Sequence, residues 1–273
     1  MPIITLTSDI GQQDFIVGAV KGQLLSCSPS FNICDITHHL SQSNYPQAAY
    51  VCSNAFKHYP KETFHIIILN LFETQPKQLL IAKYNQQYIA CPDNGILTMI
   101  AGEKPNEIIT LDITGCQTLL QFTGLIAAGA KKIADGVLFE TIGTPVQSIV
   151  EKYPLRATIG NNWMEGQILF IDQFENVVIN ITKQEFEEQK NGRSFKIVFK
   201  RNEVIDIISP NYSSVFEGEK LAWFNSAGYL EISINKGNIA GLFGLQGFNE
   251  KMQQQNASVQ NKWFYQTVKI FFE

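Results

Sequence analysis

Hydrophobic positions in the first half of the chain alternate between short apolar runs and longer amphipathic stretches. The apolar runs predict strands at Ile3–Leu6, Phe31–Ile36, Phe64–Leu69, Gln78–Tyr84, Tyr88–Cys91 and Ile108–Asp112. Apolar residues at helical spacing predict helices at Ile16–Cys27, Gln47–Phe56, Gly95–Ala101, Gly124–Ala134 and Val146–Lys152. Short strands rich in Ile and Val, separated by helices, are typical of a largely parallel sheet. We therefore expect residues 1–150 to form an α/β domain with a mostly parallel sheet.

The pattern changes after a stretch that contains Gly143, Pro145, Pro154 and Gly160. Residues 151–162 are interpreted as a linker. Beyond them, short apolar segments predict strands at Glu165–Asp172, Val177–Ile181, Ser194–Val198, Leu221–Phe224, Tyr229–Ile234 and Trp263–Ile270. Closely spaced short strands with intervening turns favour a small β-barrel, so residues 163–273 are predicted to be an all-β barrel domain.

Composition narrows the class of partner. The chain has 273 residues, of which 45% are hydrophobic, enough for one large domain or two modest ones with their own cores. Its net charge is −4 and it contains no long basic run, which argues against nucleic acid or an anionic membrane as a partner. A membrane span is not expected, because no run of about 18 apolar residues occurs.

The cysteines and histidines argue against disulfides and metals. Five scattered cysteines lack a CxxC pair and are interpreted as reduced thiols of a cytoplasmic protein. No signal peptide is expected, since the chain enters a strand directly. His38 and His39 are adjacent, and adjacent side chains diverge in a helix or a strand, so no metal site is predicted.

The first predicted strand ends in an acidic loop with the sequence Thr7-Ser8-Asp9-Ile10-Gly11. A carboxylate at the carboxyl end of such a strand lies where α/β sheets bind ligands. Without phosphate-binding glycines, Asp9 suits hydroxyl groups such as a ribose diol. The alternative is that Ser8 or Asp9 caps the following helix.

Five longer blocks occur in order along the chain: TLTSDIGQQDFIVGAVKG, CDITHHL, CPDNGILT, EGQILFIDQFENVVINI and FEGEKLAWFNSAGYLEISINKGNIAGLFGL. Together they resemble the S-adenosylmethionine hydroxide adenosyltransferases, relatives of the bacterial fluorinase and chlorinase. The resemblance covers nearly the whole chain. It implies an N-terminal α/β domain, a C-terminal β-barrel, and a homotrimer that binds its ligand between the N-domain of one subunit and the C-domain of the next.

The resemblance also implies a reaction. In this family a nucleophile displaces methionine from the 5′ carbon of S-adenosylmethionine, and water as the nucleophile yields adenosine and methionine. The sulfonium is already activated, so neither a metal nor a cofactor is expected, and S-adenosylmethionine is substrate or ligand. The protein is expected to orient the nucleophile and to remove its hydration shell.

Ligand-binding residues of the N-terminal half follow from the matching blocks. Asp9 matches the carboxylate that holds the ribose hydroxyls. Asp14 matches a second acidic position of that loop, where helix capping is the alternative. Asp93 and Asn94 match a turn near the ligand, where an Asx turn before a helix is the alternative.

The C-terminal blocks imply a second set of contacts. Asp172 matches the acid that receives the methionine ammonium, and Asn176 matches the amide that reads the adenine edge. Phe174 lies between them and is either core or contact. Tyr212 aligns with the aromatic residue that stacks on adenine. The turn Asn225-Ser226 matches the group that contacts the methionine carboxylate.

The catalytic positions depart from the family. Its water-activating Asp, Arg and His align with Asn70, Lys77 and Gln121. An amide cannot take a proton from water, lysine lacks the planar fork of arginine, and glutamine does not titrate near neutral pH. Hydroxide transfer is therefore expected to be slow, unless a neighbour such as Glu73 substitutes.

Three functions remain open at this point. The first hypothesis is a divergent S-adenosylmethionine hydrolase. The second is a catalytically inactive homologue that binds S-adenosylmethionine or adenosine. The third hypothesis is another adenosyl transfer, in which Lys77 holds an anionic nucleophile. The family default favours the hydrolase.

Overall fold

The computed structural model describes residues 2–42, 44–72, 78–247 and 267–273. The chain divides into two compact units, Met1–Pro154 and Leu155–Glu273, which are described separately. In the described parts of the chain, no helix combines the length and the apolar character that a membrane span requires.

The N-terminal unit is built on one mixed sheet with the strand order β2-β1-β3-β5-β4-β6-β7. Its strands are β1 (Ile3–Ser8), β2 (Asn32–Thr37), β3 (Phe64–Ile68), β4 (Leu79–Tyr84), β5 (Gln87–Pro92), β6 (Glu107–Leu111) and β7 (Thr144–Pro145). The strands β2, β1, β3 and β5 pair in parallel, whereas β4 pairs with β5 and β6, and β6 with β7, in antiparallel fashion.

The expectation of a mostly parallel sheet is therefore wrong for half of the sheet. The physical reason is the two-residue connection between β4 and β5. Asn85 and Gln86 adopt φ values of 50° and 62°, the left-handed conformation of a tight hairpin. A turn of this length can only reverse the chain, because a parallel neighbour needs a long crossover.

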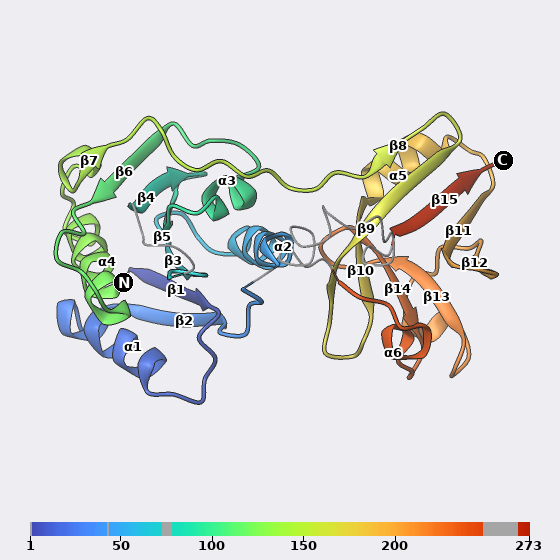
Figure 1. Cartoon of the computed structure of the whole chain (residues 1–273), viewed down its shortest axis with the longest axis horizontal. Helices are drawn as coiled ribbons and strands as arrows, with labels where there is room; N and C mark the ends of the chain where they lie inside the picture. Colours follow the sequence, from blue (N-terminus) through green and yellow to red (C-terminus); the bar gives the residue numbers. More distant parts are fainter. Residues whose placement is uncertain (1, 43, 73–77, 248–266) are drawn as a thin grey trace, which may run out of the picture. The chain divides into compact units, whose positions relative to one another are not determined.

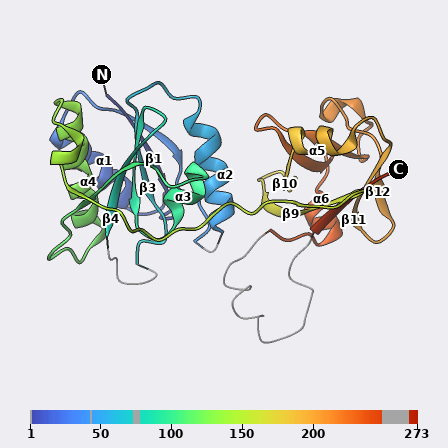
Figure 2. The ribbon, with the colours of Figure 1, turned by 90° about the horizontal axis from the view of Figure 1, so that it is seen from above.

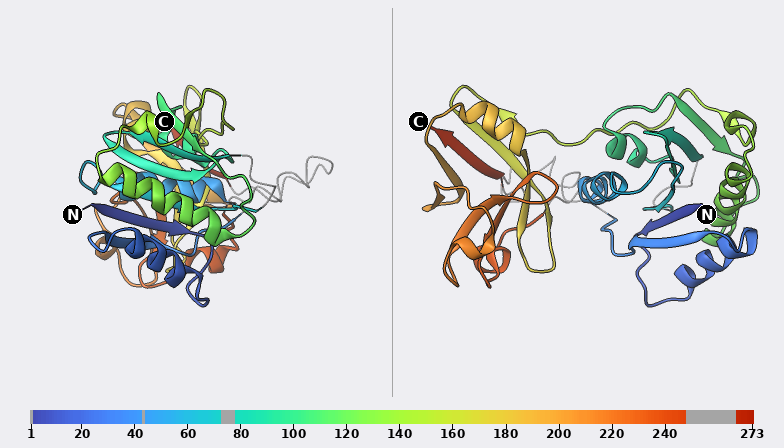
Figure 3. Two further views of the ribbon diagram at one scale, coloured as in Figure 1. Left: turned by 90° about the vertical axis from the view of Figure 1, so that its left-hand side faces the viewer. Right: turned by 180° about the vertical axis from the view of Figure 1, so that it is seen from behind.

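Two pairs of helices cover the two faces of this sheet, giving an α/β/α sandwich (Figures 1 and 2). On one face lie α1 (Ile16–Cys27) and α4 (Leu119–Ala134), side by side in the left panel of Figure 3. On the other face lie α2 (Tyr45–Phe56) and α3 (Ile96–Ala101). Strand alternation supplies both cores: in β3, Ile66 packs in the core under α1 and α4, and Ile67 in the core under α2 and α3.

The helix predicted at Val146–Lys152 is absent, and this segment has no regular secondary structure. Instead of forming helical turns, the N–H of Val146 donates to the carbonyl of Ile108 in β6 at 3.0 Å, and two further N–H groups bond side chains. The N–H of Val150 donates to Asp93 Oδ1 at 2.8 Å, and the N–H of Lys152 to Thr98 Oγ1 at 2.9 Å. These two bonds hold the segment against the β5–α3 turn and α3. A short 3-10 turn, η1 (Phe139–Thr141), precedes it.

The C-terminal unit is an antiparallel, nearly closed, barrel-like sheet with the strand order β12-β11-β15-β9-β10-β14-β13, and β8 pairs with β9. Its strands are β8 (Thr158–Ile159), β9 (Trp163–Ile171), β10 (Val177–Thr182), β11 (Phe195–Lys200), β12 (Glu203–Ile205), β13 (Lys220–Phe224), β14 (Tyr229–Ile234) and β15 (Thr267–Phe272). Part of the strand predicted at Trp263–Ile270 lies outside the described residues. Its apolar core includes Ile179, Phe186, Ile197 and Ile232.

Short helices occur within this β unit. They are α5 (Lys183–Lys190), the 3-10 turn η2 (Tyr212–Ser214) and α6 (Ile239–Phe243). The helix α5 begins with a capping box in which Thr182 and Glu185 satisfy each other's backbone N–H groups. Its one buried residue, Phe186, anchors it to the barrel core.

Candidate functional site

Asp9 lies directly after β1, at the edge where the parallel strands end. Its N–H donates to the carbonyl of Ile68 in the neighbouring β3 at 3.1 Å, and its Oδ2 accepts the N–H of Asn70 at 2.7 Å. Burial raises the pKa of the Asp9 carboxyl, and the hydrogen bond from Asn70 opposes part of that rise. Two of the predicted residues are thus adjacent, and they lie just beyond the ends of the neighbouring strands β1 and β3.

Neither Ser8 nor Asp9 caps the following helix. The N-cap of α1 is Phe15, and no side chain caps it. The exposed Asp14 accepts the N–H of Phe15 through Oδ1 at 2.6 Å, a local contact at the entrance to the helix. The capping alternative for Ser8 and Asp9 is therefore wrong, and Asp9 is left facing Asn70.

Asn94 joins this edge of the sheet from the β5–α3 turn. Its Nδ2 donates to the carbonyl of Leu69 at 2.9 Å, and its Oδ1 accepts the N–H of Ile96 at 3.3 Å. The second contact is the Asx turn foreseen as the alternative. Its neighbour Asp93 bonds the Val150 N–H, as described above. Asn94 thus helps to hold the end of β3 that presents Asn70 to Asp9.

Gln121, a predicted catalytic position, has a structural task in the helix cap of α4. Its Oε1 accepts the N–H groups of Gln117 at 2.8 Å and Thr118 at 2.9 Å, completing a capping box. The T-x-x-Q spacing before an apolar run is itself a sequence signature of such a cap. Lys77, the other predicted catalytic position beside Asn70, lies outside the described residues.

In the C-terminal unit, Asp172 organises the turn between β9 and β10. Its Oδ1 accepts the N–H groups of Phe174 at 2.8 Å and Asn176 at 2.9 Å, and its Oδ2 accepts Asn176 Nδ2 at 3.0 Å. Asn176 is buried, whereas the Phe174 side chain is 66% exposed. This exposure places Phe174 outside the core of the unit, and its contact with the ligand stays a prediction.

Asn176 leads from this turn to a buried carboxylate that the sequence analysis missed. Its Nδ2 also donates to the Tyr212 hydroxyl at 3.4 Å, which in turn donates to Glu231 Oε1. Glu231 lies in β14 and is only 4% exposed. Burial and the Glu231 carboxylate raise the pKa of Tyr212, so its hydroxyl keeps its proton and remains a donor.

Three further groups donate to Glu231. Trp223 Nε1 lies 3.0 Å and Ser233 Oγ 3.1 Å from Oε1, and Asn225 Nδ2 lies 3.2 Å from Oε2. Trp223 also packs against Tyr212, with ring centroids 4.6 Å apart. A glutamate at an otherwise buried strand position is the signal that could have identified this centre, because such a charge needs several donors.

The turn after β13 is organised by Asn225. Its Oδ1 accepts the N–H groups of Ala227 at 3.0 Å and Tyr229 at 3.2 Å, while its Nδ2 reaches Glu231. Ser226 is exposed at the tip of this turn. Hydrogen bonds therefore connect four of the six predicted C-terminal residues through one buried carboxylate, and Phe174 and Ser226 lie exposed beside them.

The chemistry of these groups suits a polar organic ligand. The residues comprise carboxylates, amides, a phenol and an indole. Within the described residues no group of three or more His, Cys, Asp and Glu side chains is placed to hold a metal ion.

Comparisons with known proteins agree with this layout. The profile of the SAM hydroxide adenosyltransferase N-terminal domain matches residues 4–143, and that of the C-terminal domain matches residues 166–250. The (R)-S-adenosyl-L-methionine hydrolase of Methanocaldococcus jannaschii is 26% identical over 261 residues, covering 92% of this chain and 95% of that protein. The fluorinase of Actinopolyspora mzabensis is 23% identical over 283 residues, covering 90% of this chain and 94% of its own length.

A solved structure shares the fold. The crystal structure of an uncharacterized conserved protein from Thermotoga maritima superimposes with a TM-score of 0.80 at 23% sequence identity. The match covers 98% of this chain and 99% of that one.

Proposed function

The chain belongs to the SAM hydroxide adenosyltransferase family, and we propose that it hydrolyses S-adenosylmethionine to adenosine and methionine. Water oxygen bonds to the 5′ carbon as the carbon–sulfur bond breaks; methionine leaves with the electron pair, and one water proton passes to solvent. The observation that carries the proposal is the family match across both units, together with the polar groups gathered at Asp9 and at Glu231.

We assign the residues roles on the same basis. Asp9 receives the ribose hydroxyls as a hydrogen-bond acceptor. Asp172 receives the methionine ammonium, and Asn176 and Tyr212 contact the adenine. Donors that converge on Glu231 hold Tyr212 and Asn225 in place, so the ligand meets preorganised groups.

A binding protein without turnover is the second candidate, and two observations favour it. Asn70 offers Asp9 its backbone N–H rather than a base, and Gln121 is engaged in a helix cap. General-base assistance contributes roughly 10²–10⁴-fold, so its loss makes hydrolysis slow. The triple change Asn70→Asp, Lys77→Arg and Gln121→His should raise the rate by about 10²-fold or more if only that assistance is missing.

The experiment that separates the two candidates follows adenosine released from S-adenosylmethionine by chromatography. Turnover that Asp9→Asn abolishes supports the hydrolase, provided that it stays intact in the control Asp135→Asn, which changes an exposed residue at the C-terminal end of α4. A ligand-dependent rise in melting temperature without adenosine release supports the binding protein. A chain that neither binds nor hydrolyses S-adenosylmethionine would contradict both.

Asp172 can be tested separately from the fold of its turn. Asp172→Asn should weaken the binding of S-adenosylmethionine roughly 10- to 100-fold and the binding of adenosine much less, because only S-adenosylmethionine carries the ammonium group. Equal losses for both ligands in calorimetry would show that Asp172 serves only the turn that it bonds.

Assembly and location remain predictions. We propose a homotrimer, as expected for the family, and light scattering that reports a monomer with intact ligand binding would contradict it. All five cysteines are free thiols, which supports a reducing, cytoplasmic location.

A further inference from the structure

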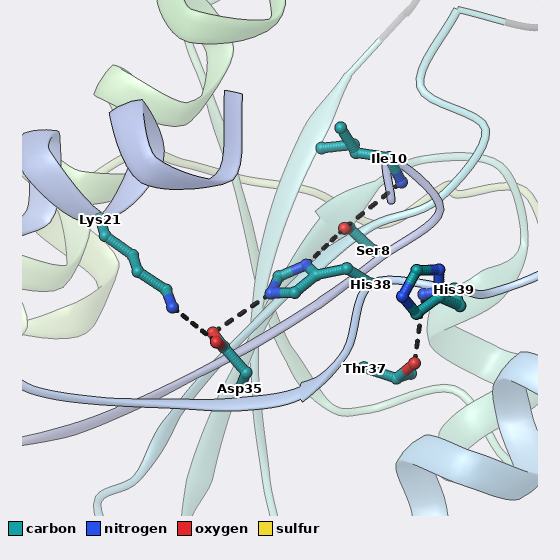
Figure 4. A network of polar contacts seen from close by, with 7 residues as sticks. All are labelled: Ser8, Ile10, Lys21, Asp35, Thr37, His38 and His39. Carbon is teal, nitrogen blue, oxygen red and sulfur yellow. Dashed lines mark hydrogen bonds and ion pairs between the residues drawn. The ribbon is translucent and has the colours of Figure 1, made fainter. Parts of the chain in front are cut away.

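A chain of polar contacts runs from the surface of α1 to the residue before Asp9 (Figure 4). Lys21 Nζ lies 2.5 Å from Asp35 Oδ2, and Asp35 Oδ1 lies 3.2 Å from His38 Nε2. His38 Nδ1 lies 2.7 Å from Ser8 Oγ, which accepts the N–H of Ile10 at 3.4 Å. Ser8 and His38 are 1% and 2% exposed, so this part of the chain of contacts is closed to solvent.

A bulge in β2 brings Asp35 and His38 to the same face of the sheet. In a regular strand, residues three apart point to opposite faces. Here Leu6 pairs with Asp35 and Thr7 with Thr37, so one extra residue is inserted in β2. His38 therefore follows the pleat of Ser8, on the face that α1 covers with Lys21.

The contacts indicate the tautomer of His38. Its Nε2 lies at ion-pair distance from Asp35 but forms no hydrogen bond of regular geometry. Burial works to raise the pKa of Asp35, but its contacts with Lys21 and His38 hold it below the usual value, so this carboxylate is ionised. An ionised carboxylate favours a proton on the nitrogen that faces it, Nε2. Nδ1 is then the acceptor, Ser8 Oγ–H the donor, and the Ser8 oxygen is free to accept from Ile10.

We propose that His38 is a positioning residue for Asp9. Its imidazole fixes the hydroxyl of Ser8, which fixes the N–H of Ile10, so both neighbours of Asp9 are held. The His38 carbonyl also accepts the N–H of Gly11 at 2.7 Å. With its flanks held, the Asp9 carboxylate stays aimed at the Asn70 N–H and at the ligand hydroxyls assigned to it above. This inference rests on the proposed function.

Two substitutions separate the contacts of the two imidazole nitrogens, Nδ1 and Nε2. In His38→Asn the side-chain oxygen occupies the place of Nδ1 and can still accept from Ser8, but the contact with Asp35 is lost. In His38→Gln the terminal amide occupies the place of Nε2, and the Ser8 bond is lost. Asparagine leaves the larger cavity, so a role in packing alone would make it the worse substitution, whereas the proposal makes glutamine the worse one.

The measurements are the affinity for adenosine by calorimetry and amide hydrogen exchange of the segments around residues 8–11 and 68–72. His38→Gln and Ser8→Ala should each weaken the binding of adenosine about 3- to 10-fold and speed amide hydrogen exchange at Asn70. The double variant that combines the two changes should lose no more affinity than either single variant. His38→Asn should stay close to wild type in both. Ser8→Ala carries the test if His38→Gln does not fold.

Other outcomes overturn the proposal or the function, and they can be told apart. An affinity that falls and an exchange rate that rises in order of cavity size, with asparagine worst, would leave His38 a packing residue. A wild type that binds neither adenosine nor S-adenosylmethionine would contradict the proposed function, yet exchange at Asn70 would still support or refute the positioning role.

Discussion

His65 makes the stability of the N-terminal unit depend on pH, and His65→Phe tests this. The residue lies in β3 and is fully buried, with Nδ1 2.7 Å from Thr5 Oγ1. Its ring stacks on Phe56 with centroids 3.7 Å apart and meets the edge of Tyr59 at 5.7 Å. Burial lowers the pKa of His65 to about 4, from 6.5 in the open chain.

The sign of the effect follows from which state binds the proton. Between pH 4 and 6.5 the unfolded chain protonates this imidazole and the folded chain does not, so the free energy of unfolding falls as the pH falls. The contribution of His65 to the free energy of unfolding does not change with pH above about pH 7, and it levels off below about pH 4. The difference between a pKa of about 4 in the folded chain and 6.5 in the unfolded chain corresponds to about 3 kcal/mol in the limit, of which about 2 kcal/mol is lost by pH 5.

The assay is urea unfolding of wild type and His65→Phe at pH 7.5 and pH 5.0. Phenylalanine keeps the stack on Phe56 but cannot titrate, and it leaves the Thr5 hydroxyl without its hydrogen-bond partner at both pH values. Between the two pH values the wild type should therefore lose about 2 kcal/mol more than the variant, at equal m-values. Parallel losses in the two proteins would refute the reasoning, since other groups titrate in both.

Three further outcomes are expected. Glu231→Gln turns the acceptor that faces Asn225 into a donor, so urea unfolding should show a loss of about 1–3 kcal/mol, and an unchanged midpoint would contradict the role of that carboxylate. Gly166→Ala places a Cβ 2.5 Å from Ile179 Cγ2, which should cost about 1–3 kcal/mol in the same assay, and a neutral result would mean that the barrel core yields there. Burial raises the pKa of the Cys52 thiol to about 12, so at pH 8 a thiol reagent should modify Cys27 well before Cys52; equal rates would show that the N-terminal core opens readily.

The sequence by itself determined most of the elements and the family. Helical periodicity predicted Ile16–Cys27 with the bounds that the structure has, and a short apolar segment between turns did the same for Tyr229–Ile234. These patterns are local: each residue's neighbours within one or two turns decide which face it presents. The prediction that Asp9 ends a strand is local in the same sense, and it placed that carboxylate at the edge of the sheet.

The tertiary structure alone decided strand direction and the partners of polar side chains. The hairpin at Asn85 and Gln86 made the sheet mixed. The apolar pattern of the two flanking strands does not show whether they pair in parallel or antiparallel fashion. The bulge that aligns Asp35 with His38 appears only when β2 is paired with β1. Three donors to Glu231 belong to its own β13–β14 hairpin, but Tyr212 comes from the separate turn η2, and its spacing along the chain carries no sign that it meets this carboxylate. Register and long-range contacts depend on the whole packed sheet, and no local pattern contains them.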